Sequence, residues 1–124
     1  MRRNFSTKRQ AIYDMLVSRK DHPSAKQIYE SLKPSYPDLS LGTVYRNISL
    51  FKQEGMADSV CTLKGEERLD GNKKPHAHLI CTECGSITDV FFDRLDVIED
   101  KGEMEGFLTE RKVISFYGKC RNCR

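Results

Sequence analysis

The sequence of 124 residues lacks any apolar run long enough to cross a membrane. Its first residues, MRRNFSTKRQ, also lack the apolar core of a secretory signal peptide. These two absences predict a cytoplasmic protein, in which cysteine thiols stay reduced and free to hold zinc. A chain of this length has too little interior for a large enclosed active site, so we expect one domain or two very small ones.

The net charge is also low, at only +3. That value alone argues weakly for nucleic-acid binding, because many soluble domains carry as much. Its distribution is more informative: residues 1–70 hold 12 Lys and Arg against 9 Asp and Glu, and residues 71–124 hold 9 against 9. The basic excess therefore lies entirely in the first part, which predicts two parts with different tasks.

Three helices are predicted in the first part, each starting at a hydroxyl side chain. Thr7 with Gln10, and Ser24 with Gln27, are capping-box patterns, and a third start follows at Ser40. Apolar residues recur at helical spacing behind each start. They are Ile12, Met15 and Leu16, then Ala25, Ile28 and Leu32, then Leu41, Val44, Ile48 and Phe51.

A hairpin is predicted after the third helix. Gly55 is placed to end that helix in a left-handed conformation, and the segments MADSVCTL and ERLD, joined across residues 64–66, are typical of two short strands. Three short helices followed by a hairpin form a winged helix-turn-helix, whose third helix enters the major groove of DNA. We therefore predict a winged-helix DNA-binding domain over residues 1–70.

The outward face of the third predicted helix carries candidate DNA contacts. At about 100° per residue, Arg46 points almost directly away from the apolar stripe, with Tyr45 and Asn47 at its borders. Such a face is often only a solvated helix surface, but the order of the elements and the basic bias favour DNA binding. The predicted DNA-binding residues are Arg9, Ser40, Thr43, Tyr45, Arg46 and Asn47.

Four of the five cysteines form two Cys-x-x-Cys pairs, Cys81 with Cys84 and Cys120 with Cys123. Two such pairs can close a tetrahedral shell of four thiolates with no open position, which predicts a structural Zn(II) site. The double spacing disfavours the alternative, in which the four are small buried hydrophobic residues. Cys61 has no partner at such spacing and is interpreted as a small side chain packed under the hairpin.

The chain contains only three histidines, His22, His76 and His78. On a strand, His76 and His78 project to the same face, so they can bind one ion together. Each candidate ligand also has a purely structural interpretation, such as a turn residue for Asp70 and a solvated strand end for Asp89. If the three histidines, Asp70 and Asp89 meet at one point, three nitrogens and two oxygens form a shell that suits Fe(II) or Mn(II).

The segments HPSAKQIYESL, LSLGTVYRNISLFKQEG, ERLDG, HAHLICTECG and CRNC resemble, in this order, the ferric uptake regulator family of bacterial metal-dependent repressors. The resemblance covers essentially the full chain. It implies an α+β homodimer with a winged helix-turn-helix domain at 1–70, a hinge at 71–75 and a small C-terminal α/β dimerisation domain with structural zinc at 76–124. It also implies double-stranded operator DNA as the partner. The regulatory metal ligands implied are His22, Asp70, His76, His78 and Asp89.

The resemblance is greatest to the peroxide-sensing branch of the family. Asp89 is aspartate as in the peroxide sensors, whereas iron-uptake repressors more often have glutamate there. Pro75 and Ala77 stand where iron-uptake repressors often carry ligands of another site, and LTERKV lacks a histidine that those proteins often have. We therefore expect Fe(II) at the hinge site to react with hydrogen peroxide, oxidise a coordinating histidine and release the operator.

Two alternatives to a peroxide sensor stay open. The first is an iron- or manganese-responsive uptake repressor with the same hinge site. The second, more remote, is a small zinc hydrolase that uses a metal-bound water. A five-ligand shell leaves little room for a substrate, and no separate general base is evident, so we expect a protein that is not an enzyme.

Overall fold

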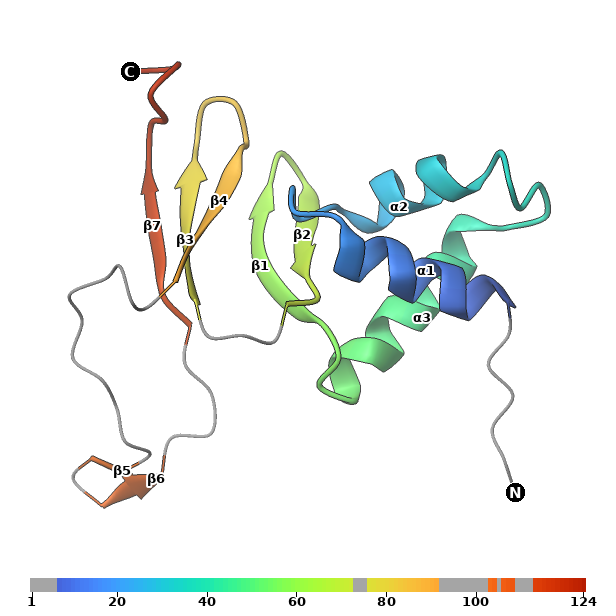
Figure 1. Ribbon diagram of the computed structural model, residues 1–124, viewed down its shortest axis with the longest axis horizontal. Helices are drawn as coiled ribbons and strands as arrows, with labels where there is room; N and C mark the ends of the chain where they lie inside the picture. Colours follow the sequence, from blue (N-terminus) through green and yellow to red (C-terminus); the bar gives the residue numbers. More distant parts are fainter. Residues whose placement is uncertain (1–6, 73–75, 92–102, 105, 109–112) are drawn as a thin grey trace. The chain divides into compact units, whose positions relative to one another are not determined.

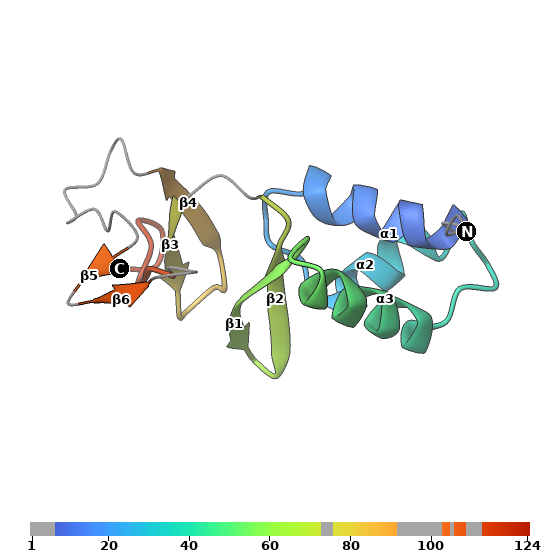
Figure 2. The same cartoon turned by 90° about the horizontal axis from the view of Figure 1, so that it is seen from below.

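The computed structural model describes residues 7–72, 76–91, 103–104, 106–108 and 113–124 (Figure 1, Figure 2). The chain divides into two compact units, Met1–Lys73 and Lys74–Arg124. Residues 73–75 of the predicted hinge lie outside the described residues, as do Thr109 to Lys112 of the segment LTERKV. Among the described residues, no helix is long and apolar enough to span a membrane.

The first unit contains the three expected helices, α1 (Thr7–Ser18), α2 (Ala25–Leu32) and α3 (Leu41–Gln53). The capping box at α2 is confirmed: the Ser24 hydroxyl accepts from the Gln27 amide at 3.1 Å, and the Gln27 side chain accepts from the Ser24 amide at 2.9 Å. Ser40 caps α3 as predicted. Thr7 instead lies within α1 as its first residue, and the Gln10 side chain donates to Asp14 at 2.8 Å, so the capping box predicted there is not formed.

The helices pack around one apolar core. Figure 1 and Figure 2 show α1, α2 and α3 arranged side by side in this unit. The predicted apolar faces supply most of it, with Met15 packed at its margin and Leu41 half-buried. Tyr13 meets Phe51 edge-to-face with ring centroids 5.4 Å apart. The buried core residues are Ile12, Leu16, Ala25, Ile28, Leu32, Leu39, Val44, Ile48, Phe51, Ala57 and Leu69.

The predicted hairpin is formed by β1 (Asp58–Leu63) and β2 (Glu66–Asp70), which pair antiparallel. Lys64 and Gly65 connect them, and both have positive φ (52° and 81°), the conformation that a two-residue turn needs to match the twist of the strands. Gly55, with φ of 75°, follows α3 in the predicted left-handed conformation. Cys61 on β1 is half-buried, and burial raises the pKa of its thiol.

The second unit is built on a sheet with the strand order β4-β3-β7 (Figure 1). Strand β3 (His76–Cys81) pairs antiparallel with β4 (Ile87–Phe91) and parallel with β7 (Ser115–Gly118). Two short strands, β5 (Glu103–Met104) and β6 (Phe107–Leu108), form a separate antiparallel pair. All elements described in this unit are strands, so the described residues do not test the helical part of the predicted α/β domain.

Candidate metal centres and nucleic-acid interface

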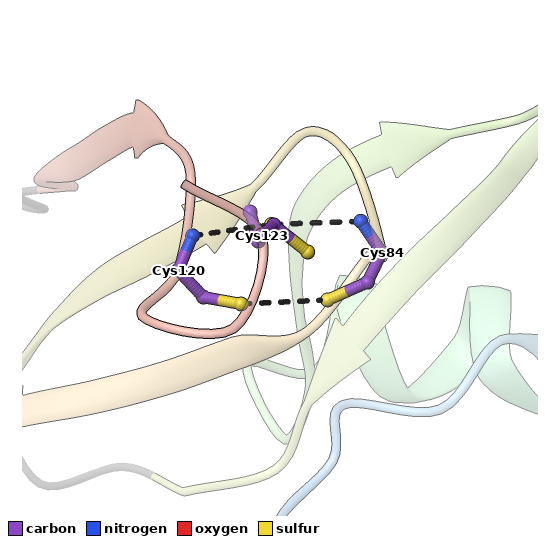
Figure 3. A group of neighbouring side chains, drawn as sticks. Cys84, Cys120 and Cys123 are labelled. Atoms are coloured by element: carbon purple, nitrogen blue, oxygen red, sulfur yellow. Dashed lines mark hydrogen bonds between the residues drawn. The ribbon is translucent and has the colours of Figure 1, made fainter.

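The parallel pairing of β3 with β7 brings the two Cys-x-x-Cys pairs to one end of the sheet. Cys81 ends β3 opposite Gly118, and Cys120 follows two residues later. The sulfur atoms of the four cysteines lie within 4.8 Å of one another, and Figure 3 shows three of these side chains gathered there. The Sγ atoms of Cys84 and Cys120 are 3.8 Å apart. Two sulfurs at about 2.3 Å from one tetrahedral zinc are separated by about 3.8 Å, so this spacing fits Zn(II).

Backbone amides at the same end of the sheet favour the ionised form of one thiol. The amides of Cys84 and Cys120 donate to Sγ of Cys81 at 3.5 and 3.3 Å, and these hydrogen bonds lower the pKa of Cys81 to about 6. The neighbouring thiols of Cys120 and Cys81 raise the pKa of Cys123 to about 12. Four thiolates at this spacing repel one another unless a cation lies between them, so the cluster has the chemistry of a cation site.

Two of the predicted regulatory ligands lie in the first unit. His22 and Asp70 are both buried, and Nε2 of His22 lies 3.8 Å from Oδ2 of Asp70. Asp70 is the last residue of β2, and its Oδ1 accepts a hydrogen bond from the amide of Asn72 at 2.8 Å. An imidazole nitrogen and a carboxylate oxygen therefore face each other away from solvent, which suits a shared cation.

The other three predicted ligands lie together in the second unit. The Nε2 atoms of His76 and His78, both on β3, are 3.1 Å apart, as expected for side chains on the same face of a strand. The antiparallel register sets Asp89 of β4 opposite His78, and its Oδ1 lies 3.5 Å from Nε2 of His76 and 3.7 Å from Nε2 of His78. Two nitrogens and one oxygen thus converge on one point.

Phe91 is a residue of this cluster that the sequence analysis missed. It pairs with His76 across β3 and β4, with ring centroids 5.4 Å apart. The spacing in the sequence could have indicated Phe91, because it lies two residues after Asp89 and the two side chains therefore share one face of the strand. The aromatic ring limits the orientations open to the His76 imidazole.

The outward face of α3 carries exposed polar groups. Tyr45 is 52% exposed, and Arg46 is exposed beside it. Nη2 of Arg46 donates to Oγ1 of Thr43 at 3.0 Å, and that oxygen lies 2.9 Å from Oγ of Ser40. A Cβ at Gly42 would approach Nη1 of Arg46 to 3.3 Å, so the glycine leaves room for the guanidinium. These groups form a hydrogen-bonding surface along the helix.

Asn47 differs from the other predicted DNA contacts. Its side chain is buried, with Nδ2 donating to the Thr43 carbonyl at 2.9 Å and Oδ1 accepting from Nε of Arg9 at 2.6 Å. Helical periodicity placed Asn47 at the border of the outward face, but α1 covers that border and supplies the partner. Asn47 therefore joins α1 to α3, and Arg9 is oriented by this contact.

Comparison with known proteins gives the same family as the sequence motifs. Residues 3–117 match the model of the Ferric uptake regulator family. The chain is 34% identical to the peroxide-responsive repressor PerR of Staphylococcus epidermidis over 117 residues, which is 94% of this chain and 78% of that protein.

Two solved structures are also similar to this chain. The peroxide stress regulator of Campylobacter jejuni superposes with a TM-score of 0.75 at 27% identity, over 94% of this chain and 88% of that one. The ferric uptake regulator of Francisella tularensis, solved with iron, gives a TM-score of 0.76 at 21% identity, over 97% and 93% of the two chains, a likeness of fold alone. These relatives are transcriptional regulators rather than enzymes. The chain belongs to the ferric uptake regulator family of metal-dependent transcriptional repressors.

Proposed function

We propose that this chain is a peroxide-responsive repressor that binds operator DNA as a metallated homodimer and is released when a coordinating histidine is oxidised. The observation that carries this proposal is the presence of two separate kinds of donor set in one small chain. One is all sulfur, and the other consists of imidazole and carboxylate groups. The soft set favours zinc and the mixed set favours Fe(II) or Mn(II), so scaffold and sensor are chemically distinct.

The regulatory site in this proposal takes ligands from both units. His22 and Asp70 come from the first unit, and the convergent cluster of His76, His78 and Asp89 comes from the second. One ion bound by both sets would link the DNA-binding domain at 1–70 to the dimerisation domain at 76–124 across the hinge at 71–75. Metal binding would thereby fix the angle between the two DNA-binding domains of the dimer.

The zinc site serves as scaffold in the same proposal. Cys81, Cys84, Cys120 and Cys123 are proposed to hold one Zn(II) with no open position, which leaves no place for substrate or peroxide. The cluster ties the end of β3 to the segment after β7. A cytoplasmic location keeps these thiols reduced and available to the metal.

Operator recognition is assigned to α3. Arg46 can donate two hydrogen bonds to a guanine edge in the major groove, and Tyr45, Thr43 and Ser40 can contact phosphates or bases beside it. Asn47 is buried against Arg9, so we assign Asn47 to holding α3 against α1. Arg9 shares this contact, and we also assign it to contacts with the DNA backbone. The partner is double-stranded DNA.

A second copy of the chain is the proposed occupant of the exposed apolar face on β3 and β7. Leu79 and Phe116 are paired in register on these strands and are 44% and 46% exposed. Large exposed apolar side chains on adjacent strands are typical of a surface that another protein covers. A homodimer also matches operators made of two half-sites.

The branch of the family is proposed from Asp89 and from the relatives. Iron(II), when bound, would promote cleavage of the O–O bond of hydrogen peroxide, and a coordinating imidazole is the nearest group that can supply the two electrons which the peroxide accepts. One peroxide oxygen would be inserted into a C–H bond of the imidazole of His22 or His76, and the other would leave as water. The oxidised histidine would be a poorer ligand, so the metal and then the operator would be released. An iron- or manganese-responsive uptake repressor remains the second candidate, because the same donor set accommodates either ion without peroxide chemistry.

The deciding experiment compares the Fe(II) and Mn(II) forms under peroxide. The DNA probe is a duplex selected in vitro from a random library with the Mn(II)-loaded protein. With Fe(II), low peroxide should add one oxygen atom to the tryptic peptide of His22 or His76, with loss of DNA binding in parallel. With Mn(II), the same dose should change neither. If the Fe(II) form keeps its DNA with unmodified histidines at doses that oxidise free thiols, the protein is an uptake repressor.

A further inference from the structure

Arg68 connects the hairpin of the first unit to the loop that carries His22. It lies on β2, two residues before Asp70. Its Nε donates to the carbonyl of His22 at 2.5 Å, and its Nη2 donates to the carbonyl of Asp21 at 2.6 Å. The planar guanidinium thus holds two consecutive carbonyls with its fixed fork of donors.

The backbone of His22 needs such a restraint. Its φ is 56°, in the left-handed region that side chains with a Cβ rarely adopt. The ring of Pro23 further biases the preceding residue toward an extended conformation. If the loop relaxed to that conformation, the imidazole would move from its place 3.8 Å from Asp70.

Strand β2 supplies a third hydrogen bond to the same loop. The amide of Leu69 donates to the carbonyl of Pro23 at 3.0 Å. Residues 68–70 therefore fix the loop at 21–23 and also provide Asp70. Within the first unit, one short strand carries one proposed ligand and determines the position of the other.

We propose that Arg68 is a positioning residue for the regulatory metal, which holds His22 in the left-handed conformation that faces its imidazole toward Asp70. This inference rests on the proposed function, because it assigns His22 to the metal shell. Arg68 acts through backbone carbonyls, so its effect does not require contact with the ion. A ligand pair held in place before binding has less conformational freedom to lose when the metal arrives.

The test measures Mn(II) affinity of the zinc-loaded protein by electron paramagnetic resonance of free Mn(II). Arg68→Met removes both donated hydrogen bonds and should weaken Mn(II) binding by roughly 10- to 100-fold, the range typical of residues that orient metal ligands. Arg68→Lys keeps the charge but lacks the planar fork, so its loss should be smaller. The matched control is Lys52→Met. It removes the cation that pairs at 2.8 Å with Glu67, the residue before Arg68 on β2, and it should leave the Mn(II) affinity unchanged.

A double-mutant cycle with His22→Ala separates positioning from general destabilisation. If Arg68 acts through His22, Arg68→Met should have no further effect once His22 is alanine. An equal loss in both backgrounds would overturn the proposal, as would wild-type affinity for Arg68→Met while His22→Ala binds weakly. If His22→Ala itself binds Mn(II) normally, the ligand set of the proposed function is wrong and the role of Arg68 falls with it. Zinc content and thermal unfolding of each variant, including the milder Arg68→Lys, identify any variant that does not fold.

Discussion

The backbone amide of Cys120 donates to Sγ of Cys81 across 3.3 Å, although the two residues are 39 positions apart. This contact exists because β7 runs parallel to β3 and ends beside it. The proposed zinc site and the sheet of the second unit therefore depend on each other. Loss of one cysteine ligand should affect the fold of the unit as well as the metal content.

Cys84→Ser should unfold the second unit and dissociate the dimer. Structural zinc in small modules contributes roughly 10 to 16 kcal/mol of apparent binding free energy, which is comparable with the whole stability of a domain. Zinc content by elemental analysis and mass by light scattering measure the effect. The control is Cys61→Ser, which lies on β1 outside the cluster and should keep its zinc. A well-folded dimer with a full zinc in Cys84→Ser would contradict the four-thiolate site.

Arg46→Ala should abolish binding to the selected operator duplex without changing zinc content or dimer mass. The exposed guanidinium is the group on α3 best suited to reading a base edge, and the side chain packs into no core. Fluorescence anisotropy with labelled duplex measures the loss. Lys20→Ala, which removes one exposed charge outside α3, is the control for net charge and should retain most of the affinity. Wild-type affinity in Arg46→Ala would reject α3 as the recognition helix.

Asn47→Ala should lower the stability of the first unit. The change removes the hydrogen bond from Nε of Arg9 and the one to the Thr43 carbonyl, and a hydrogen bond that involves a charged group contributes about 1.5 to 3 kcal/mol. Urea unfolding followed by circular dichroism gives the difference. The base preference of the remaining folded protein, measured by competition among mutated operators, should stay the same. Unchanged stability with altered base preference would instead make Asn47 a direct contact.

Asp89→Glu should retain metal binding but slow the oxidation of histidine by peroxide. The longer side chain still offers a carboxylate, yet it cannot keep the oxygen 3.5 Å from Nε2 of His76 and 3.7 Å from that of His78 without moving. Tryptic-peptide mass spectrometry across a peroxide titration of the Fe(II) form gives the rate. Oxidation at the unchanged rate would show that position 89 does not set the response to peroxide.

Gly71→Ala should destabilise the first unit by about 1 to 3 kcal/mol, the cost typical of overpacking. A Cβ at this position would lie 2.9 Å from Cγ1 of Val17 and 3.3 Å from its Cα, so α1 would have to shift. Thermal unfolding measures the loss. Gly65→Asn is a useful comparison, because the turn is open there and asparagine tolerates positive φ, so its loss should be smaller. An unchanged melting temperature in Gly71→Ala would show that α1 adjusts freely.

The sequence by itself determined the local features of both units. Caps at Ser24 and Ser40, the apolar faces of three helices, the turn after β1 and the shared face of His76 and His78 follow from backbone geometry over a few residues. The same short-range rules erred at Thr7, where a capping pattern lies inside the helix. The motifs also indicated the family, which the comparisons confirm.

Motif spacing indicated that the two cysteine pairs meet, but only the tertiary structure decided how distant segments pair. The parallel pairing of β3 and β7 unites the cysteine pairs, and the antiparallel register sets Asp89 opposite His78. Asn47 is buried against Arg9, and Arg68 donates a hydrogen bond to the carbonyl of His22. These contacts also join residues far apart in sequence. Periodicity cannot predict such pairings, because it describes the direction of a side chain from its own helix or strand and not the element that packs against it.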